Sequence, residues 1–298
     1  MTIMSEITIV KNKGAIKRKK NTPMYEVWNR LKKNRMAMGG LIVLFIILLS
    51  AIFAPYIIPY DYAEQDYDAK LQLPNSEHWF GTDNFGRDIF SRIIYGGRYT
   101  LFISFTCITI AAFIGSIMGL IAAFYSRLDN IIMRIIDIFM GIPSMLMCVS
   151  IIAALGSNMW NMMIALCVTA VPEFARIMRA QVLTIKEQEF IESARSIGAS
   201  NFRIIRKHII PNSMAPIIVQ YTLGAVNVIL MSAALSFIGM GVQPPTPEWG
   251  LMISAGRAYL RDQWYICILP GLAIVVTSYA LNLLGDGLRD ALDPRLKQ

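Results

Sequence analysis

The sequence has little charge and few polar residues for its length. Only 16% of its 298 residues are charged, whereas 55% are hydrophobic, and the mean hydropathy is +0.49. A soluble chain of this size needs far more polar surface to cover its core. The composition therefore excludes a soluble globular protein and predicts an integral membrane protein.

Residue types that bind metals or form disulfides are also scarce. The two histidines, His78 and His208, are too few for a transition-metal site built from protein ligands alone. The four cysteines lie inside apolar stretches and show no paired spacing, which favours packing residues over a disulfide framework or a metal site. They are Cys107, Cys148, Cys167 and Cys267. We expect no bound metal and no other cofactor.

Motifs for catalysis are missing as well. The chain has no G-x-x-x-x-G-K-[ST] loop, so it cannot hold the phosphates of ATP by that route. It also lacks the H-E-x-x-H and G-x-S-x-G motifs that would support a membrane hydrolase. The sequence therefore predicts a protein that is not an enzyme, and any energy from ATP has to come from another polypeptide.

Long uncharged runs are what the sequence does contain. About 20 helical residues cross a hydrocarbon core of about 30 Å, and "LGSN" at residues 155–158 divides one of the runs in two. The pattern predicts an all-α membrane protein with six transmembrane helices. They are expected near residues 37–59, 100–125, 131–155, 160–182, 213–239 and 266–285.

The basic residues predict the orientation of these helices. If the N-terminus is cytoplasmic, the cytoplasmic segments hold 22 of the 28 Lys and Arg residues. This bias follows the positive-inside rule and places both termini in the cytoplasm. The net charge of +8 therefore reflects topology at the edges of apolar blocks, and we expect no nucleic acid as a partner.

The same reasoning divides the chain into four regions. Residues 1–36 form a basic cytoplasmic tail, in which the run at residues 11–21 is interpreted as solvated and topogenic rather than lipid-binding. Residues 37–98 hold an uncleaved first helix and an extracytoplasmic loop. Residues 99–286 form a core of five helices, and residues 287–298 form a cytoplasmic C-terminal tail.

A charged island interrupts the core region at residues 183–212. Eight charged residues lie between Lys186 and Lys207. At roughly 3 kcal/mol each, their burial near the bilayer centre would cost on the order of 20 kcal/mol. This segment is therefore expected on the cytoplasmic side.

The island has the pattern of two short amphipathic helices. One apolar face holds Phe190, Ile191, Ala194 and Ile197, and a second holds Phe202, Ile205 and Ile209. Gly198 suits a left-handed helix end, Ser200 or Asn201 suits the next cap, and Pro211 closes the unit. Periodicity does not decide between a knob that docks in a partner's groove and a helix pair that lies on lipid headgroups.

These residues resemble the EAA motif of permease subunits of ABC importers. The match is Glu192-Ser193-Ala194, then Gly198, then the ending His208-Ile209-Ile210-Pro211, although Ser193 and His208 depart from the usual residues. In that family the loop is a coupling helix that inserts into a cleft of the ATPase subunit. The resemblance implies that coupling residues are Glu192, Ser193, Ala194, Gly198, Arg203 and Pro211.

Three longer stretches resemble the C-type permease of dipeptide and oligopeptide importers, namely residues 78–98, 235–257 and 281–297. The resemblance implies a type I importer fold in a bacterial cytoplasmic membrane. It also implies a homologous B-type permease, two ATPase subunits and an extracytoplasmic binding protein as partners. Peptides are the expected substrate, with nickel or a metal chelate as the alternative.

A self-sufficient carrier that uses Asp137 is a further alternative, because an acid inside a span is a candidate functional residue. Such carriers usually show inverted repeats, and we find no repeat between the halves of this chain. We interpret Asp137 as a structural partner of Arg134, one turn earlier on the same helix. Glu173 and Arg176, near the cytoplasmic end of the fourth span, are interpreted as helix-end anchors rather than as a pair at a gate.

Two outer loops complete the expectations. "GTDNFGRD" at residues 81–88 lacks the ligand spacing of a calcium loop, and we expect it to turn the chain into a surface helix over residues 87–95. The proline-rich loop at residues 241–250 carries Trp249, which suits the membrane interface. Either loop is a candidate contact for the binding protein.

Overall fold

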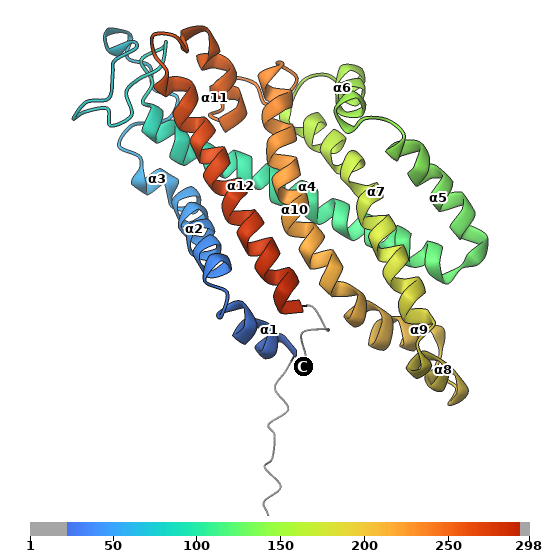
Figure 1. The fold of residues 1–298 in the computed structure, drawn as a ribbon. Coiled ribbons are helices and arrows are strands. Elements are labelled where there is room, and N and C mark those ends of the chain that lie inside the picture. The colour runs from blue at the N-terminus through green and yellow to red at the C-terminus, as the bar shows by residue number, and fades with distance from the viewer. Residues whose placement is uncertain (1–22, 293–298) are drawn as a thin grey trace, which may run out of the picture.

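The computed structural model describes residues 23–292, and the basic run at residues 11–21 lies outside this range. Every regular element in the described range is a helix, as Figure 1 shows. The α-helices are α1 Pro23–Leu31, α2 Arg35–Ile52, α3 Ala54–Ile57, α4 Ile89–Phe124, α5 Ser126–Met140, α6 Ser144–Leu155, α7 Met159–Lys186, α8 Glu189–Ser196, α9 Asn201–Ile204, α10 Ile210–Phe237, α11 Trp249–Gly256 and α12 Tyr265–Leu292. Single turns of other helix types are η2 Tyr67–Ala69, η3 Ile205–Ile209 and η4 Arg257–Tyr259.

Five helical segments are long and apolar enough to cross a membrane. They are α2, α4, α7, the continuous run from α9 to α10, and α12. The pair α5 and α6 passes the same test only together, and it is bent by 91°. The structure thus supports five spans, or six if the bent pair is one span.

The expectation of one unbroken helix over residues 131–155 is wrong. The chain leaves the helix after Met140 and re-enters it at Ser144. Pro143 has no N–H to donate, and it also disfavours helical backbone at the preceding residue. The break expected at residues 155–158 is confirmed, because α6 ends at Leu155 and the Asn158 side chain caps α7.

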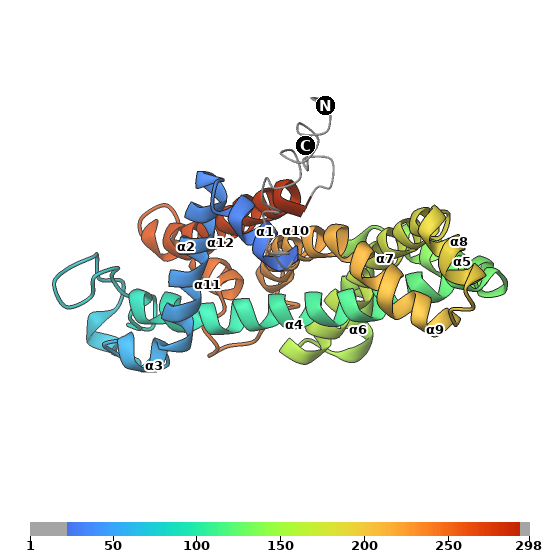
Figure 2. The same ribbon diagram turned by 90° about the horizontal axis from the view of Figure 1, so that it is seen from below.

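Helix α4 crosses the molecule, while α2, α12, α10 and α7 stand side by side across it (Figures 1 and 2). The end of α12 lies beside α1, at the end of the bundle that also carries α8 and α9 (Figure 1). Helices α6 and α11 lie at the opposite end (Figure 1). This arrangement puts the charged island at the same end as both described chain ends.

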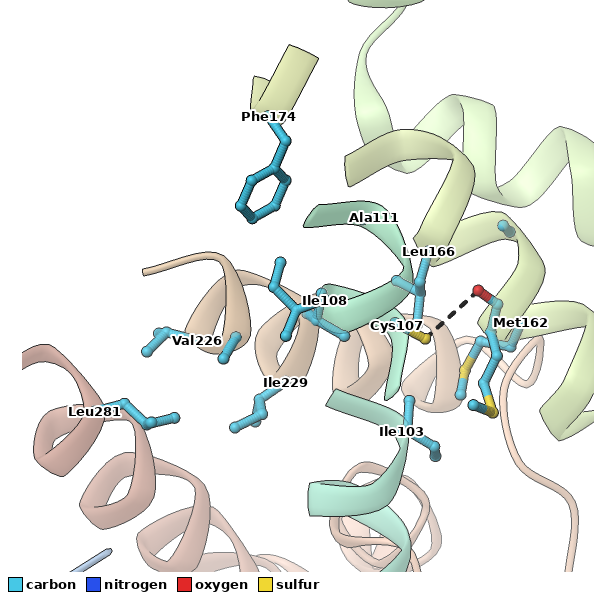
Figure 3. Packing of buried hydrophobic residues seen from close by; sticks show 14 of the residues in the cluster. Ile103, Cys107, Ile108, Ala111, Met162, Leu166, Phe174, Val226, Ile229 and Leu281 are labelled. Atoms are coloured by element: carbon cyan, nitrogen blue, oxygen red, sulfur yellow. Dashed lines mark hydrogen bonds between the residues drawn. The ribbon is translucent and has the colours of Figure 1, made fainter. Parts of the chain in front are cut away.

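The core is centred on the contact between α4 and α7. Gly115 and Gly119 face α7 with the spacing of a G-x-x-x-G motif, which lets two helix backbones approach closely. A Cβ atom on Gly115 would lie 2.5 Å from the Val171 carbonyl oxygen. Figure 3 shows the neighbouring layer, where the Cys107 Sγ donates a hydrogen bond to the Met163 carbonyl at 3.5 Å.

The surface helix expected over residues 87–95 does not exist as a separate element. Helix α4 begins at Ile89 and continues unbroken to Phe124, and the Asp88 carboxylate caps it by accepting a hydrogen bond from Ser91 N at 2.7 Å. Gly96 allows this straight course because a Cβ there would collide with the Pro247 carbonyl. The first turns of the helix are therefore packed under the outer loops rather than lying on a surface.

The outer loops form a cap stabilised by an ion pair and by hydrogen bonds. Arg87 Nε donates to Asp83 Oδ2 at 2.7 Å, and Arg92 Nη1 donates to the Tyr62 carbonyl at 2.7 Å. The expected interfacial position of Trp249 is wrong, because its side chain is only 3% exposed. Its indole N–H donates to the Ile93 carbonyl at 2.9 Å, so it fastens the 241–250 loop to α4.

Candidate functional site

The charged island forms a bent unit between α7 and α10, which we call the α8–α9 elbow (residues 187–209). Helix α8 ends in a pair of capping hydrogen bonds, from Ala199 N to the Ala194 carbonyl at 3.0 Å and from Gly198 N to the Arg195 carbonyl at 2.9 Å. This is the Schellman pattern, which needs a left-handed residue, and Gly198 has φ +79°. The predicted glycine hinge is confirmed.

The second helix of the elbow begins as expected. The Ser200 hydroxyl accepts a hydrogen bond from Arg203 N at 3.4 Å and caps α9. Beyond Ile204 the backbone passes through the π turn η3 directly into α10.

The expectation that Pro211 closes the elbow is wrong, because this residue lies in the first turn of α10. A proline is tolerated there because the π turn η3 just before it shifts the backbone hydrogen bonds, with Ile210 N donating to the Ile205 carbonyl. The helix of α10 therefore continues the elbow without a flexible joint.

The apolar faces of the elbow divide into an inner and an outer set. Ile191, Ala194, Ile204 and Ile209 are buried and join the hydrophobic core of the bundle. By contrast, Phe190 is 42% exposed, Ile197 is 86% exposed and Phe202 is 71% exposed.

The predicted stripes were therefore only partly correct. Each stripe contains side chains that pack inward and others that point outward, and Ile204 was missing from both. Periodicity groups residues on a face, but it does not define how much of that face the bundle covers.

Charged side chains surround the exposed apolar ones. Glu189, Glu192 and Arg195 are exposed on α8. On α9 and η3, a hollow of about 370 Å³ is lined by Phe202, Arg203, Arg206 and Lys207. The elbow thus presents a mixed apolar and charged surface, as expected of a docking surface with a polar rim.

The residues implied by the EAA resemblance occupy different environments. Glu192, Gly198, Arg203 and Pro211 are exposed. Ala194 is buried against the bundle, so it fixes α8 in place rather than meeting a partner. The Ser193 hydroxyl donates to the Glu189 carbonyl at 3.0 Å, within α8 itself.

The ionic pairs inside the bundle differ from the predicted ones. Asp137 pairs with Arg176 of α7, with Arg176 Nη2 donating to Asp137 Oδ1 at 2.7 Å, and not with Arg134. Because α5 packs against α7, the guanidinium reaches the carboxylate across the helix contact, which spacing along one helix cannot reveal. Glu173 lies at the midpoint of α7, because this helix continues to Lys186.

A second cross-helix pair was missed altogether. Arg179 Nε and Nη2 donate to the two carboxylate oxygens of Asp129, each at 2.6 Å. This bidentate geometry is the strongest form of an Arg–carboxylate contact. The sequence signal for both pairs was the spacing of two acids, two turns apart on α5, and two arginines, one turn apart on α7. In residues 23–292, no group of three or more His, Cys, Asp or Glu side chains could hold a metal ion.

Solved structures are similar to this chain in fold. One is an inward-facing conformation of the MetNI methionine ABC transporter, with a TM-score of 0.51 and 20% identity. The match covers 65% of this chain and 94% of that chain. At this identity the likeness supports the type I importer permease fold alone.

Named relatives are similar along nearly the whole chain. The dipeptide transport system permease protein DppC of Alkalihalophilus pseudofirmus is 47% identical over 277 residues, which cover 93% of this chain and 91% of the relative. The di/tripeptide transport system permease protein DppC of Pseudomonas aeruginosa is 42% identical, with 93% of each chain covered. The glutathione transport system permease protein GsiD of Escherichia coli is 44% identical, covering 93% of this chain and 92% of the relative.

Two family models match this chain, one near its N-terminus and one over its C-terminal part. Residues 22–74 match the N-terminal TM domain of oligopeptide transport permease C. Residues 111–298 match the binding-protein-dependent transport system inner membrane component. Since this second match spans more than half of the sequence, the chain belongs to the family of binding-protein-dependent transport system inner membrane components.

Proposed function

We propose that this chain is the permease subunit of an ATP-driven importer of short peptides, and that it forms half of the translocation pathway. Its named relatives transport dipeptides, di/tripeptides and glutathione, which is itself a tripeptide. The other half of the pathway belongs to a homologous B-type permease. The subunit is a multi-pass protein of a bacterial cytoplasmic membrane, a location supported by the family's description as an inner membrane component.

The observation that carries this proposal is the α8–α9 elbow. It projects at the end of the bundle that also holds α1 and the end of α12 (Figure 1). With both termini cytoplasmic, the elbow faces the compartment that contains ATP. Its exposed Phe190, Ile197 and Phe202 suit insertion into an apolar cleft, and its charges suit the rim of that cleft.

The geometry also supports a route by which closure of the ATPase subunits moves the membrane spans. Two ATPase subunits supply the hydrolysis, and their closure moves the elbows of the two permeases together. The elbow transmits this movement because its buried side chains join the bundle core and η3 continues into α10. The spans then change from inward-facing to outward-facing. A binding protein delivers the peptide at the opposite end, to the cap formed by the outer loops.

The alternative hypothesis of a self-sufficient carrier is not supported. That hypothesis required Asp137 as an intramembrane acid available for ion coupling. Its carboxylate is instead engaged by Arg176, and the chain's family works with separate binding proteins.

The test uses the complete complex in proteoliposomes, with peptide-stimulated ATP hydrolysis and co-purification of the ATPase subunits as readouts. Glu192→Lys reverses an exposed charge on the elbow and is expected to lower both. The control, Asp290→Lys, makes the same change in an exposed residue near the end of α12, at the same end of the bundle. An elbow that lies on lipid would instead tolerate Glu192→Lys, because added positive charge favours anionic headgroups. Normal assembly and normal stimulated hydrolysis in Glu192→Lys would refute the coupling role.

A further inference from the structure

A cavity of about 370 Å³ opens between α6, α7 and α10. Its volume lies within the range of about 300–1,000 Å³ that is typical of ligand pockets. Most of its lining is apolar, and it includes Met145, Phe174 and Met231. Glu173 and Asn227 add a carboxylate and an amide to this lining.

The cavity lies near the middle of the long helices that line it, at Glu173 of α7 and Gly224 of α10. Glu173 stands at the midpoint of α7 (Met159–Lys186), so it lies about 20 Å from either end at 1.5 Å per residue. Glu173 therefore lies inside the candidate span Met159–Lys186, where a carboxylate facing lipid is disfavoured.

Glu173 is exposed on this chain, and within residues 23–292 its carboxylate makes no hydrogen bond or ion pair. Arg176, one turn further along α7, is engaged by Asp137 at 2.7 Å. The carboxylate therefore has an open position for a cationic group. Because it cannot face lipid, it has to face either the partner permease or a water-filled pathway.

We propose that this cavity is a recognition site for a peptide in transit, in which the Glu173 carboxylate binds the peptide's α-ammonium group. The Asn227 amide offers both a donor and an acceptor to the peptide backbone. The flexible side chains of Met145 and Met231 accommodate peptide side chains of different shapes. This proposal rests on the proposed function as a peptide importer.

The first test compares peptide uptake with ATP hydrolysis in the reconstituted complex, with saturating peptide-loaded binding protein. Glu173→Gln keeps the shape of the side chain but removes its charge. Peptides moved per ATP are expected to fall by about tenfold, as for loss of one charge-assisted hydrogen bond. Glu173→Asp should retain an intermediate yield, and Glu173→Lys should be the most severe. Asp290→Asn removes an exposed acid outside the cavity and should match wild type.

A second measurement does not depend on the first. Glu173→Cys is treated with a small water-soluble thiol reagent in the assembled complex, with and without peptide during turnover. Protection by peptide is expected. Reaction that peptide does not slow would overturn the proposal, as would a wild-type transport yield in Glu173→Gln. If the wild-type complex takes up no peptide at all, the proposed function itself fails. If wild type takes up peptide, but neither the transport yield nor the thiol reactivity at position 173 responds as expected, only the recognition site is refuted.

Discussion

Arg176 donates a hydrogen bond to Asp137 at 2.7 Å and thereby ties the bent α5–α6 segment to α7. In the isolated chain the Arg176 side chain is 51% exposed and that of Asp137 is 60% exposed. Charged groups in this part of a membrane protein face the interior of an assembly or a water-filled path. The pair and the cavity beside Glu173 therefore mark a face of this chain that does not lie against lipid.

The first prediction separates this pair from the one that helix spacing suggests. Arg176→Gln is expected to lower the free energy of unfolding by about 1 kcal/mol, a value reduced for the exposure of the pair. Arg134→Gln is the matched control, since Arg134 is exposed on the same helix as Asp137. The measurement is the thermal midpoint of the detergent-solubilised subunit. A larger loss in Arg134→Gln than in Arg176→Gln would contradict the observed pairing.

The sequence predicted those parts of the fold that depend on local signals. Uncharged runs located the five continuous candidate spans, and the left-handed Gly198 and the Ser200 cap follow from single residues. The prolines of this chain, however, do not all interrupt a helix. Pro172, Pro216 and Pro270 lie inside long helices, whereas Pro143 stands at a 91° bend. Which outcome occurs depends on how neighbouring helices satisfy the backbone, and a run of apolar residues does not encode this.

The candidate site was predictable to a similar extent. Charge and periodicity located the elbow, and a motif identified its hinge. The separation of buried Ile191 from exposed Ile197 depends on where the bundle ends. The same holds for Trp249, whose indole packs against Gly96 and Gly97 of α4, more than 150 residues earlier in the chain.

The second prediction concerns the close contact of α4 with α7. Gly119→Ala is expected to cost about 1–3 kcal/mol through overpacking, because the new Cβ would collide with the Ala175 carbonyl. Gly39→Ala is the control, since nothing lies within 4 Å of a Cβ at that position of α2. Thermal unfolding of the two variants in detergent checks the difference. Equal midpoints would show that the helices do not pack as closely as described.

The third prediction tests the orientation in the membrane. Ser76→Cys in the outer cap should react with a membrane-impermeant thiol reagent added to intact cells, and Ser196→Cys in the elbow should not. Both serines are exposed, and the native cysteines are buried or half-buried, so the unmodified protein supplies the background. Labelling of Ser196→Cys without labelling of Ser76→Cys would invert the topology derived from the basic residues.

The last prediction isolates the role of the hinge in coupling. Gly198 has φ +79°, and a Cβ placed on it would meet nothing within 4 Å. A substitution there consequently acts through backbone strain alone. Left-handed backbone costs a residue with a Cβ about 1–2 kcal/mol, less for asparagine and more for a β-branched residue. Peptide-stimulated ATP hydrolysis of the complete complex should therefore fall in the order Gly198→Asn, Gly198→Ala, Gly198→Val.

Gly239 supplies a matched control for this series. It has φ +82° and equally open surroundings, but it follows α10 at the far end of the bundle from the elbow. Gly239→Ala should cost a similar amount of conformational free energy while leaving stimulated hydrolysis and ATPase co-purification intact. Because strain is equal at the two positions, only the place where the strain acts can separate them. Equal uncoupling by Gly239→Ala and Gly198→Ala would mean that general destabilisation, and not the hinge of the elbow, limits hydrolysis.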